Sequence, residues 1–139
     1  YETHLAQGHY FIDGAEELLE TLYGQYRMYL VTNGTLSVQK GRLKSSGISR
    51  YFEDIFISEE LGYNKPGREY FDCCFSRIPD FHKETAVIIG DSLTSDIQGG
   101  INAGIRTIWF NPSHEKTSEI IPDYEFDSLM KLPELLSHI

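Results

Sequence analysis

Short apolar runs that end abruptly in polar turns alternate with helical patterns along this 139-residue chain. The clearest run, 86–89, reads Ala-Val-Ile-Ile and stops at Gly90-Asp91. Strands that are apolar throughout, rather than at every second position, are typical of sheets buried on both faces. The pattern therefore predicts an α/β fold, with a parallel sheet covered by helices on both sides. Further runs of this kind cover 28–31, 55–57 and 106–110.

Helical patterns fill the intervals between the expected strands. The tail, 124–139, is expected to form a short strand or extended piece followed by a closing helix. No repeat, low-complexity stretch or linker divides the sequence, so one domain is expected. The helices are expected at about 13–26, 36–46 and 67–78, and from just after Ser92 to about residue 103.

Composition restricts the partners of the chain. Twelve Lys and Arg against 21 Asp and Glu give a formal net charge of -9, which repels nucleic-acid phosphates and anionic membranes. Neither is expected as a partner. With 40% hydrophobic and 24% charged residues, the chain has the composition of an ordinary globular domain. Any anionic ligand must therefore be held locally, by a metal ion, a lysine or backbone amides.

The only two cysteines, Cys73 and Cys74, are neighbours within a helical pattern, where a disulfide between them would be strained. We expect them to be reduced and the protein to be cytoplasmic. No apolar run approaches the roughly 18 residues of a membrane span, and no leader pattern precedes the domain. The sequence opens at Tyr1 without an initiator methionine, so we expect a piece of a longer protein.

Two carboxylates follow the clearest strand. Asp91 stands at its tip and Asp96 stands at the start of the next helix, so both are expected near one point. Oxygen ligands of this kind suit Mg²⁺, which takes one or two protein carboxylates and fills its other positions with water and substrate phosphate. In the alternative, Asp91 bonds nearby amides in a plain turn and Asp96 interacts with the helix dipole.

The run Thr32-Asn33-Gly34-Thr35 follows the strand expected at 28–31. A hydroxyl followed by backbone amides that a turn has freed can hold phosphate oxygens, as P-loop amides do in other folds. The alternative is that Asn-Gly is simply a turn former and that Thr35 caps the next helix.

A third polar cluster is Lys65-Pro66. Proline fixes the chain direction at a place where a lysine could be aimed inward, and an ammonium is an effective point charge for phosphate oxygens and crowded carboxylates. The alternative is a solvated surface lysine. Ligands of such sheets gather at the carboxyl ends of the strands. The cluster that begins at Thr32 and the cluster that begins at Asp91 both follow strand ends, so we expect these two clusters to lie at the same edge of the sheet.

In this order and at these strand ends, the clusters resemble the haloacid dehalogenase-like hydrolase superfamily along essentially the whole chain. The resemblance implies a Rossmann-like three-layer core with a parallel sheet. Three of the four family motifs match: the second as Thr32-Asn33-Gly34, the third as Lys65-Pro66, and the fourth as Gly90-Asp91 with Asp96.

The resemblance also implies roles for these residues. Asp91 would be a Mg²⁺ ligand, and Asp96 would fix the metal site through water or hydrogen bonds. Lys65 would offset the charge of nucleophile and phosphate. In the family mechanism an aspartate attacks phosphorus to give an aspartyl phosphate, and a second aspartate two residues later protonates the leaving oxygen.

Phosphoryl binding would fall to the second motif. Thr32 and the amides of Asn33 and Gly34 would hold the transferring group. With Lys65 and Asp96, Thr32 completes the set of residues in this chain that the resemblance implies to be catalytic.

The first family motif, an apolar strand ending in Asp-x-Asp-Gly-Thr, is absent from the sequence. The nearest candidate is 10–14, but Phe11 stands at the place of the nucleophile and no threonine follows the glycine. We interpret 1–12 instead as the end of a cap domain and its linker, with 1–8 the last turns of a cap helix.

The missing strand would lie in the middle of the sheet, between the strands that end at Thr32 and Gly90. Two strands would then lack a partner there. The sheet is therefore expected to be incomplete, with the first strand and the cap supplied by a preceding segment of the same protein. Without that segment the chain is expected to have no phosphatase activity and to fold poorly.

Within the superfamily the sequence resembles the 5'-nucleotidases that act on pyrimidine and noncanonical nucleotides, which makes a nucleoside monophosphate the expected substrate. The alternatives are a sugar-phosphate phosphatase of the N-acylneuraminate type and a non-catalytic, receiver-like domain that only binds Mg²⁺. A dehalogenase is disfavoured because two anionic residues at a metal site have no evident use in halide displacement. The segments that carry the subgroup resemblance are 58–66, 69–71, 77–79 and 109–112.

Trp109 lies in the last of these segments and is expected to be a core residue.

Overall fold

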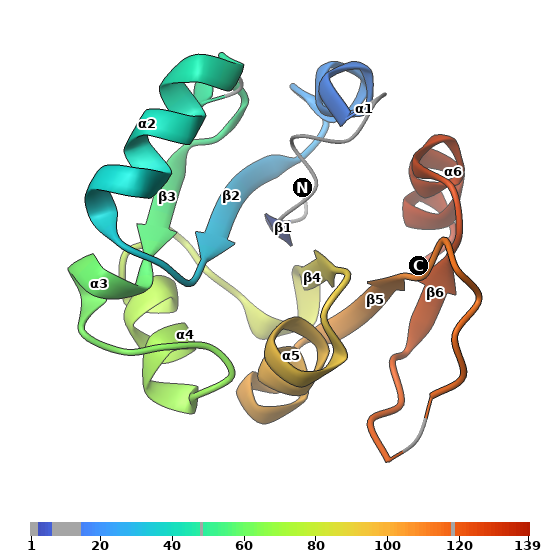
Figure 1. Ribbon diagram of the computed structural model, residues 1–139. Helices are drawn as coiled ribbons and strands as arrows, with labels where there is room; N and C mark the ends of the chain where they lie inside the picture. The colour runs from blue at the N-terminus through green and yellow to red at the C-terminus, as the bar shows by residue number, and fades with distance from the viewer. Residues whose placement is uncertain (1–2, 7–14, 48, 118) are drawn as a thin grey trace.

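The computed structural model describes residues 3–6, 15–47, 49–117 and 119–139. It contains a six-stranded sheet with helices on both faces (Figure 1), and every strand pair is parallel. The expected α/β fold is confirmed. The strands are β1 (Thr3–Ala6), β2 (Arg27–Thr32), β3 (Asp54–Ile57), β4 (Ala86–Gly90), β5 (Arg106–Phe110) and β6 (Tyr124–Phe126).

The helices lie close to their expected places. The helix expected at 13–26 is shorter, because α1 ends at Leu22 and a turn follows in which Gly24 has a φ of 89°. The sequence pattern does not predict α3, a single helical turn directly after β3. The helices are α1 (Ala15–Leu22), α2 (Leu36–Ser46), α3 (Ser58–Leu61), α4 (Arg68–Ser76), the π-helical turn η3 (Leu93–Ile97), α5 (Gln98–Ala103) and α6 (Leu132–Ser137).

The strand order is β3-β2-β1-β4-β5-β6. The chain moves outward from β1 through β2 to β3, returns to the middle of the sheet and continues through β4 to β6. The winding direction therefore reverses between β1 and β4. In open α/β sheets ligands bind outside the carboxyl ends of the strands at such a switch point.

The centre of the sheet corrects one prediction. Residues 3–6 form β1, in which Ala6 pairs with Leu30 of β2 on one side and with Ile89 of β4 on the other. The expected gap is therefore filled from within the chain, and the expected helical turns are wrong for these four residues. Unpaired backbone groups on two buried strands strongly favour any extended segment that satisfies them. The candidate segment 10–14 lies outside the described residues.

Two apolar clusters cover the two faces of the sheet. One includes Leu19 of α1 and Leu132 at the start of α6, whereas the other includes Phe71 of α4 and Ala103 of α5. In β2 and β4 successive residues contribute to opposite clusters, as side chains on a pleated strand must. This two-sided burial explains why the strands are apolar at every position.

Helix α5 packs unusually close to the sheet. A Cβ atom on Gly100 would lie 2.5 Å from Ile88 Cγ2 and 2.5 Å from Thr107 Cγ2, in β4 and β5 respectively. Only a residue without a side chain allows this approach. It brings the start of the η3–α5 segment against the carboxyl end of β4.

Both cysteines are free thiols, as expected. Burial raises the pKa of Cys74 to about 12, so its thiol stays protonated near neutral pH. In the described part of the chain no helix has the length and apolar character needed to cross a membrane.

A pair of glycine substitutions tests the close packing of α5. We expect Gly100→Ala to lower the free energy of unfolding by about 1–3 kcal/mol, because the added methyl group overlaps two buried side chains. Gly41→Ala in α2 is the matched control, since its Cβ would meet no atom within 4 Å, and it should stabilise by about 0.5–1 kcal/mol. Urea denaturation measures both. Equal stability of the two variants would contradict the packing argument.

Candidate functional site

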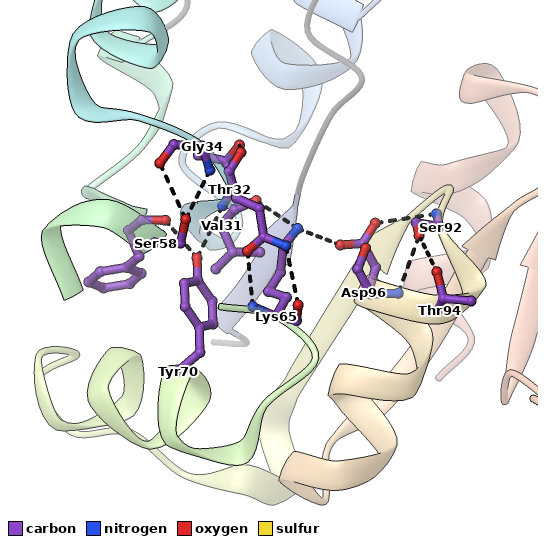
Figure 2. A network of polar contacts seen from close by, with 12 residues as sticks. Val31, Thr32, Gly34, Ser58, Lys65, Tyr70, Ser92, Thr94 and Asp96 are labelled. Atoms are coloured by element: carbon purple, nitrogen blue, oxygen red, sulfur yellow. Dashed lines mark hydrogen bonds and ion pairs between the residues drawn. The ribbon is translucent and has the colours of Figure 1, made fainter. Parts of the chain in front are cut away.

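The three polar clusters come together at the carboxyl edge of the sheet (Figure 2). Thr32 is the last residue of β2, and Asp91 directly follows the last residue of β4. Lys65 belongs to the loop between α3 and α4, and its peptide bond to Pro66 is cis. Asp96 lies in η3, the helical turn after β4.

A buried ion pair joins two of the clusters. Lys65 Nζ lies 2.6 Å from Asp96 Oδ1, and the two side chains are 1% and 0% exposed. The ammonium also donates to the carbonyl of Val31 at 3.4 Å. Lys65 therefore points inward and is held between the end of β2 and the segment after β4.

Burial acts on both members of this pair. It lowers the pKa of Lys65, and the facing Asp96 carboxylate opposes that shift. Burial likewise raises the pKa of Asp96, which the Lys65 ammonium opposes. The charge of Asp91 acts on both groups. The three side chains therefore form one electrostatic unit.

The carboxylate of Asp96 is fixed at both oxygens. Oδ1 faces Lys65, and Oδ2 accepts a hydrogen bond of 3.3 Å from the Ser92 amide. The residue beneath it must be glycine, because a Cβ on Gly90 would lie 2.5 Å from Asp96 Cγ. Gly90 thus serves to let the carboxylate lie across the end of β4.

The Asn33 side chain binds the backbone of Lys65 at two points. Its Oδ1 accepts from Lys65 N at 2.9 Å, and its Nδ2 donates to Lys65 O at 3.2 Å. This pairing mimics a backbone ladder between two loops that are far apart in sequence. It fixes the loop from which the Lys65 side chain extends.

The turn after β2 is held by side chains from α3. The Gly34 amide donates to Ser58 Oγ at 2.9 Å, and Glu59 Oε1 accepts from the Leu36 amide at the start of α2. Gly34 has a φ of 149°, which favours glycine. Binding of a phosphoryl oxygen to the Gly34 amide would have to replace the bond to Ser58.

Tyr70 bridges β2 and β3 where the two strands end. Its hydroxyl accepts from the Thr32 amide at 3.1 Å and donates to the Phe56 carbonyl at 2.6 Å. Burial raises the pKa of Tyr70, so the hydroxyl stays protonated and keeps donating. The phenol therefore fixes the backbone of Thr32, whose own hydroxyl donates to the Asn33 carbonyl at 3.3 Å.

Asp91 differs from the buried pair because its side chain is exposed. Among the described residues its carboxylate makes no hydrogen bond or ion pair, and no three His, Cys, Asp or Glu side chains there are grouped as metal ligands. One exposed carboxylate at the carboxyl edge of the sheet fits Mg²⁺, which keeps most of its positions for water and phosphate. It does not fit a metal that needs a full protein cage.

The sequence pointed to the motif residues but not to their supports. Asn33 was expected to act through its amide, whereas the structure shows its side chain bonded to the Lys65 backbone. Ser58, Glu59 and Tyr70 were not singled out at all. Ser58 and Glu59 lie in the segment 58–66, and Tyr70 lies in the segment 69–71. Both segments carry the subgroup resemblance, which is the only signal in the sequence for these three residues.

Comparisons with known proteins find relatives along most of this chain. The family model described as haloacid dehalogenase-like hydrolase matches residues 1–110. The HAD-hydrolase YfnB of Bacillus subtilis is 47% identical over 99% of this chain and 59% of its own length. Its crystal structure bound to magnesium has a TM-score of 0.88, with 48% identity over 90% of this chain and 55% of that one.

Two further relatives are named for their substrates. The pyrimidine 5'-nucleotidase PynA of Streptococcus pneumoniae is 44% identical over 98% of this chain and 58% of its own length. The N-acylneuraminate-9-phosphatase of Mus musculus is 34% identical over 91% of this chain and 52% of its length. The chain therefore spans between half and three fifths of the curated relatives it matches.

Removing one member of the buried pair should destabilise the fold. We expect Asp96→Ala to lower the free energy of unfolding by about 3–5 kcal/mol, because the Lys65 ammonium would remain buried without its partner. Adding Lys65→Met should recover part of this loss, since no uncompensated charge then remains. Chemical denaturation measures the three proteins.

The matched control is Asp72→Ala, which removes an exposed carboxylate 3.8 Å from Arg68. It should change stability by less than about 1 kcal/mol. If Asp96→Ala cost no more than this control, the pair would not be buried as described.

Proposed function

The chain belongs to the haloacid dehalogenase-like hydrolase family, and we propose that it supplies the phosphate- and Mg²⁺-binding part of a phosphatase. The observation that carries the proposal is the buried pair of Lys65 and Asp96, 2.6 Å apart, between the Thr32 turn and the exposed Asp91. A buried lysine held by a carboxylate at a switch point provides a fixed positive charge where an anion would bind.

Each residue has a distinct task in this proposal. The Thr32 hydroxyl and the Asn33 amide hydrogen-bond the transferring phosphoryl group, and the Gly34 amide joins them if it releases Ser58. Lys65 offsets the negative charge that develops on the phosphoryl oxygens. Asp96 is catalytic only through its neighbours, because it holds Lys65 in place and is fixed by the Ser92 amide.

The metal belongs at Asp91 in this scheme. Asp91 would hold Mg²⁺, which when bound supplies charge stabilisation to a phosphoryl group. We place a second carboxylate outside these 139 residues. We place the nucleophilic aspartate there too, in a preceding segment of the same protein, where it forms an aspartyl phosphate and a second aspartate protonates the leaving oxygen.

A nucleoside monophosphate is the proposed substrate. The 44% identity to a pyrimidine 5'-nucleotidase supports this choice. A sugar phosphate is the second candidate, supported by the 34% identity to an N-acylneuraminate-9-phosphatase. The residues at the carboxyl edge bind phosphate in either case, so they favour neither leaving group.

The first test separates an enzyme from a domain that only binds Mg²⁺. We expect Mg²⁺-dependent phosphate release from a longer protein that joins this chain to its preceding segment, and none from the 139 residues alone. Asp91→Ala in the longer protein should reduce the rate by about 100-fold or more, since several kcal/mol of charge stabilisation are lost. Asp72→Ala, an exposed carboxylate outside the site, should leave it unchanged.

Two results would overturn the proposal. One is robust metal-dependent turnover by the 139 residues alone, which would place a nucleophile within this chain. The other is a folded longer protein that binds Mg²⁺ but releases no phosphate, which would favour the receiver-like binding domain.

A panel of phosphate esters tests the substrate class. We expect the longer protein to have its highest kcat/KM with pyrimidine or noncanonical nucleoside monophosphates, compared with sugar phosphates at equal Mg²⁺. Phosphate release measured for each ester gives the ranking. A preference for a sugar phosphate would move the assignment to the second candidate without affecting the site.

A further inference from the structure

Trp109 links the buried strand β5 to the proposed metal ligand through one hydrogen bond. Its indole Nε1 donates to the carbonyl oxygen of Asp91 at 3.0 Å, from the strand next to the one that Asp91 follows. We propose that Trp109 is a positioning residue that holds Asp91 in the orientation in which it binds Mg²⁺. This inference rests on the proposed metal-binding role of Asp91.

Packing alone does not account for Trp109. The side chain is 2% exposed, yet it belongs to neither of the two apolar clusters that form the core. Its strand neighbours Ile108 and Phe110 belong to the cluster on the opposite face. A buried indole N–H needs an acceptor, and here the acceptor is the backbone of the proposed metal ligand.

The residues around Asp91 explain why this bond matters. Asp91 lies one position beyond β4. The residue before it, Gly90, is paired with Trp109 across the β4–β5 ladder. On the other side Ser92 is tied to the helical turn, because its Oγ accepts from the Ser95 amide at 3.2 Å and its amide donates to Asp96. The indole is therefore the contact that fixes Asp91 from the β5 side.

Loss of the indole N–H should weaken Mg²⁺ binding without removing a ligand. Trp109→Phe keeps an aromatic side chain but leaves the Asp91 carbonyl without this donor. The peptide unit of Asp91 is then less restrained and can carry the carboxylate away from its binding position, so we expect the dissociation constant for Mg²⁺ to rise by about two- to tenfold, the effect of one ordinary hydrogen bond.

The experiment is an NMR titration with MgCl₂ of the longer protein that joins this chain to its preceding segment. Trp109 is the single tryptophan of these 139 residues, and its indole N–H signal is assigned as the one that Trp109→Phe removes. In the wild type this signal should shift together with the Asp91 and Ser92 amides, with one dissociation constant. In Asp91→Asn the Mg²⁺-dependent shift should disappear. In Trp109→Phe the constant read from the two amides should rise as stated.

Phe110→Leu is the matched control. It removes buried aromatic surface from the same strand, but on the face that packs against Phe126, away from Asp91. It should lower stability while leaving the dissociation constant unchanged. An equal weakening of Mg²⁺ binding in both variants would mean that Trp109 acts through general stability, which would overturn the proposal.

The remaining outcomes separate this inference from the proposed function. Mg²⁺ shifts of the Asp91 and Ser92 amides with an unmoved indole signal, or with unchanged affinity in Trp109→Phe, would overturn the role of Trp109 and leave the metal site standing. If Trp109→Phe does not fold, the wild-type indole signal decides. No shift of any of these signals would overturn the metal site and the inference together.

Discussion

The buried contact between Lys65 and Asp96 is the interaction on which the rest of this edge of the sheet depends. It joins a loop that precedes α4 to the helical turn after β4, across the switch point where the winding reverses. Neither charge tolerates burial without the other. The surrounding features follow from this requirement: Gly90 makes room for the carboxylate, Ser92 satisfies its second oxygen and Asn33 fixes the backbone of the lysine.

The sequence predicted most of the fold because burial on both faces leaves a local mark. The apolar run of β4 and its glycine stop can be recognised without knowledge of any other strand. The central strand is different. Residues 3–6 carry no such run, and they form β1 because β2 and β4 offer unpaired backbone groups on either side. That cause lies in the assembled sheet, so a reading based on local pattern and family precedent expected helical turns there.

The same distinction holds within the candidate site. Asp91 and Asp96 could be singled out because a strand end places them, and strand ends follow from the local pattern. The tasks of Tyr70 and Trp109 could not, since each depends on a backbone atom supplied by another element. A buried aromatic residue in a sequence looks the same whether its polar atom serves packing or function. Only the position of the acceptor decides between the two.

Charge balance at this edge bears on the proposed pairing of phosphate with a metal ion. The chain carries a net charge of -9, the charge of Lys65 is already matched by Asp96, and Asp91 adds a negative charge that acts on both. A phosphate dianion would meet net repulsion here unless a divalent cation came with it. In the proposed site the buried pair thus holds the Lys65 charge at a fixed position, and the exposed Asp91 would attract a cation that arrives with its water.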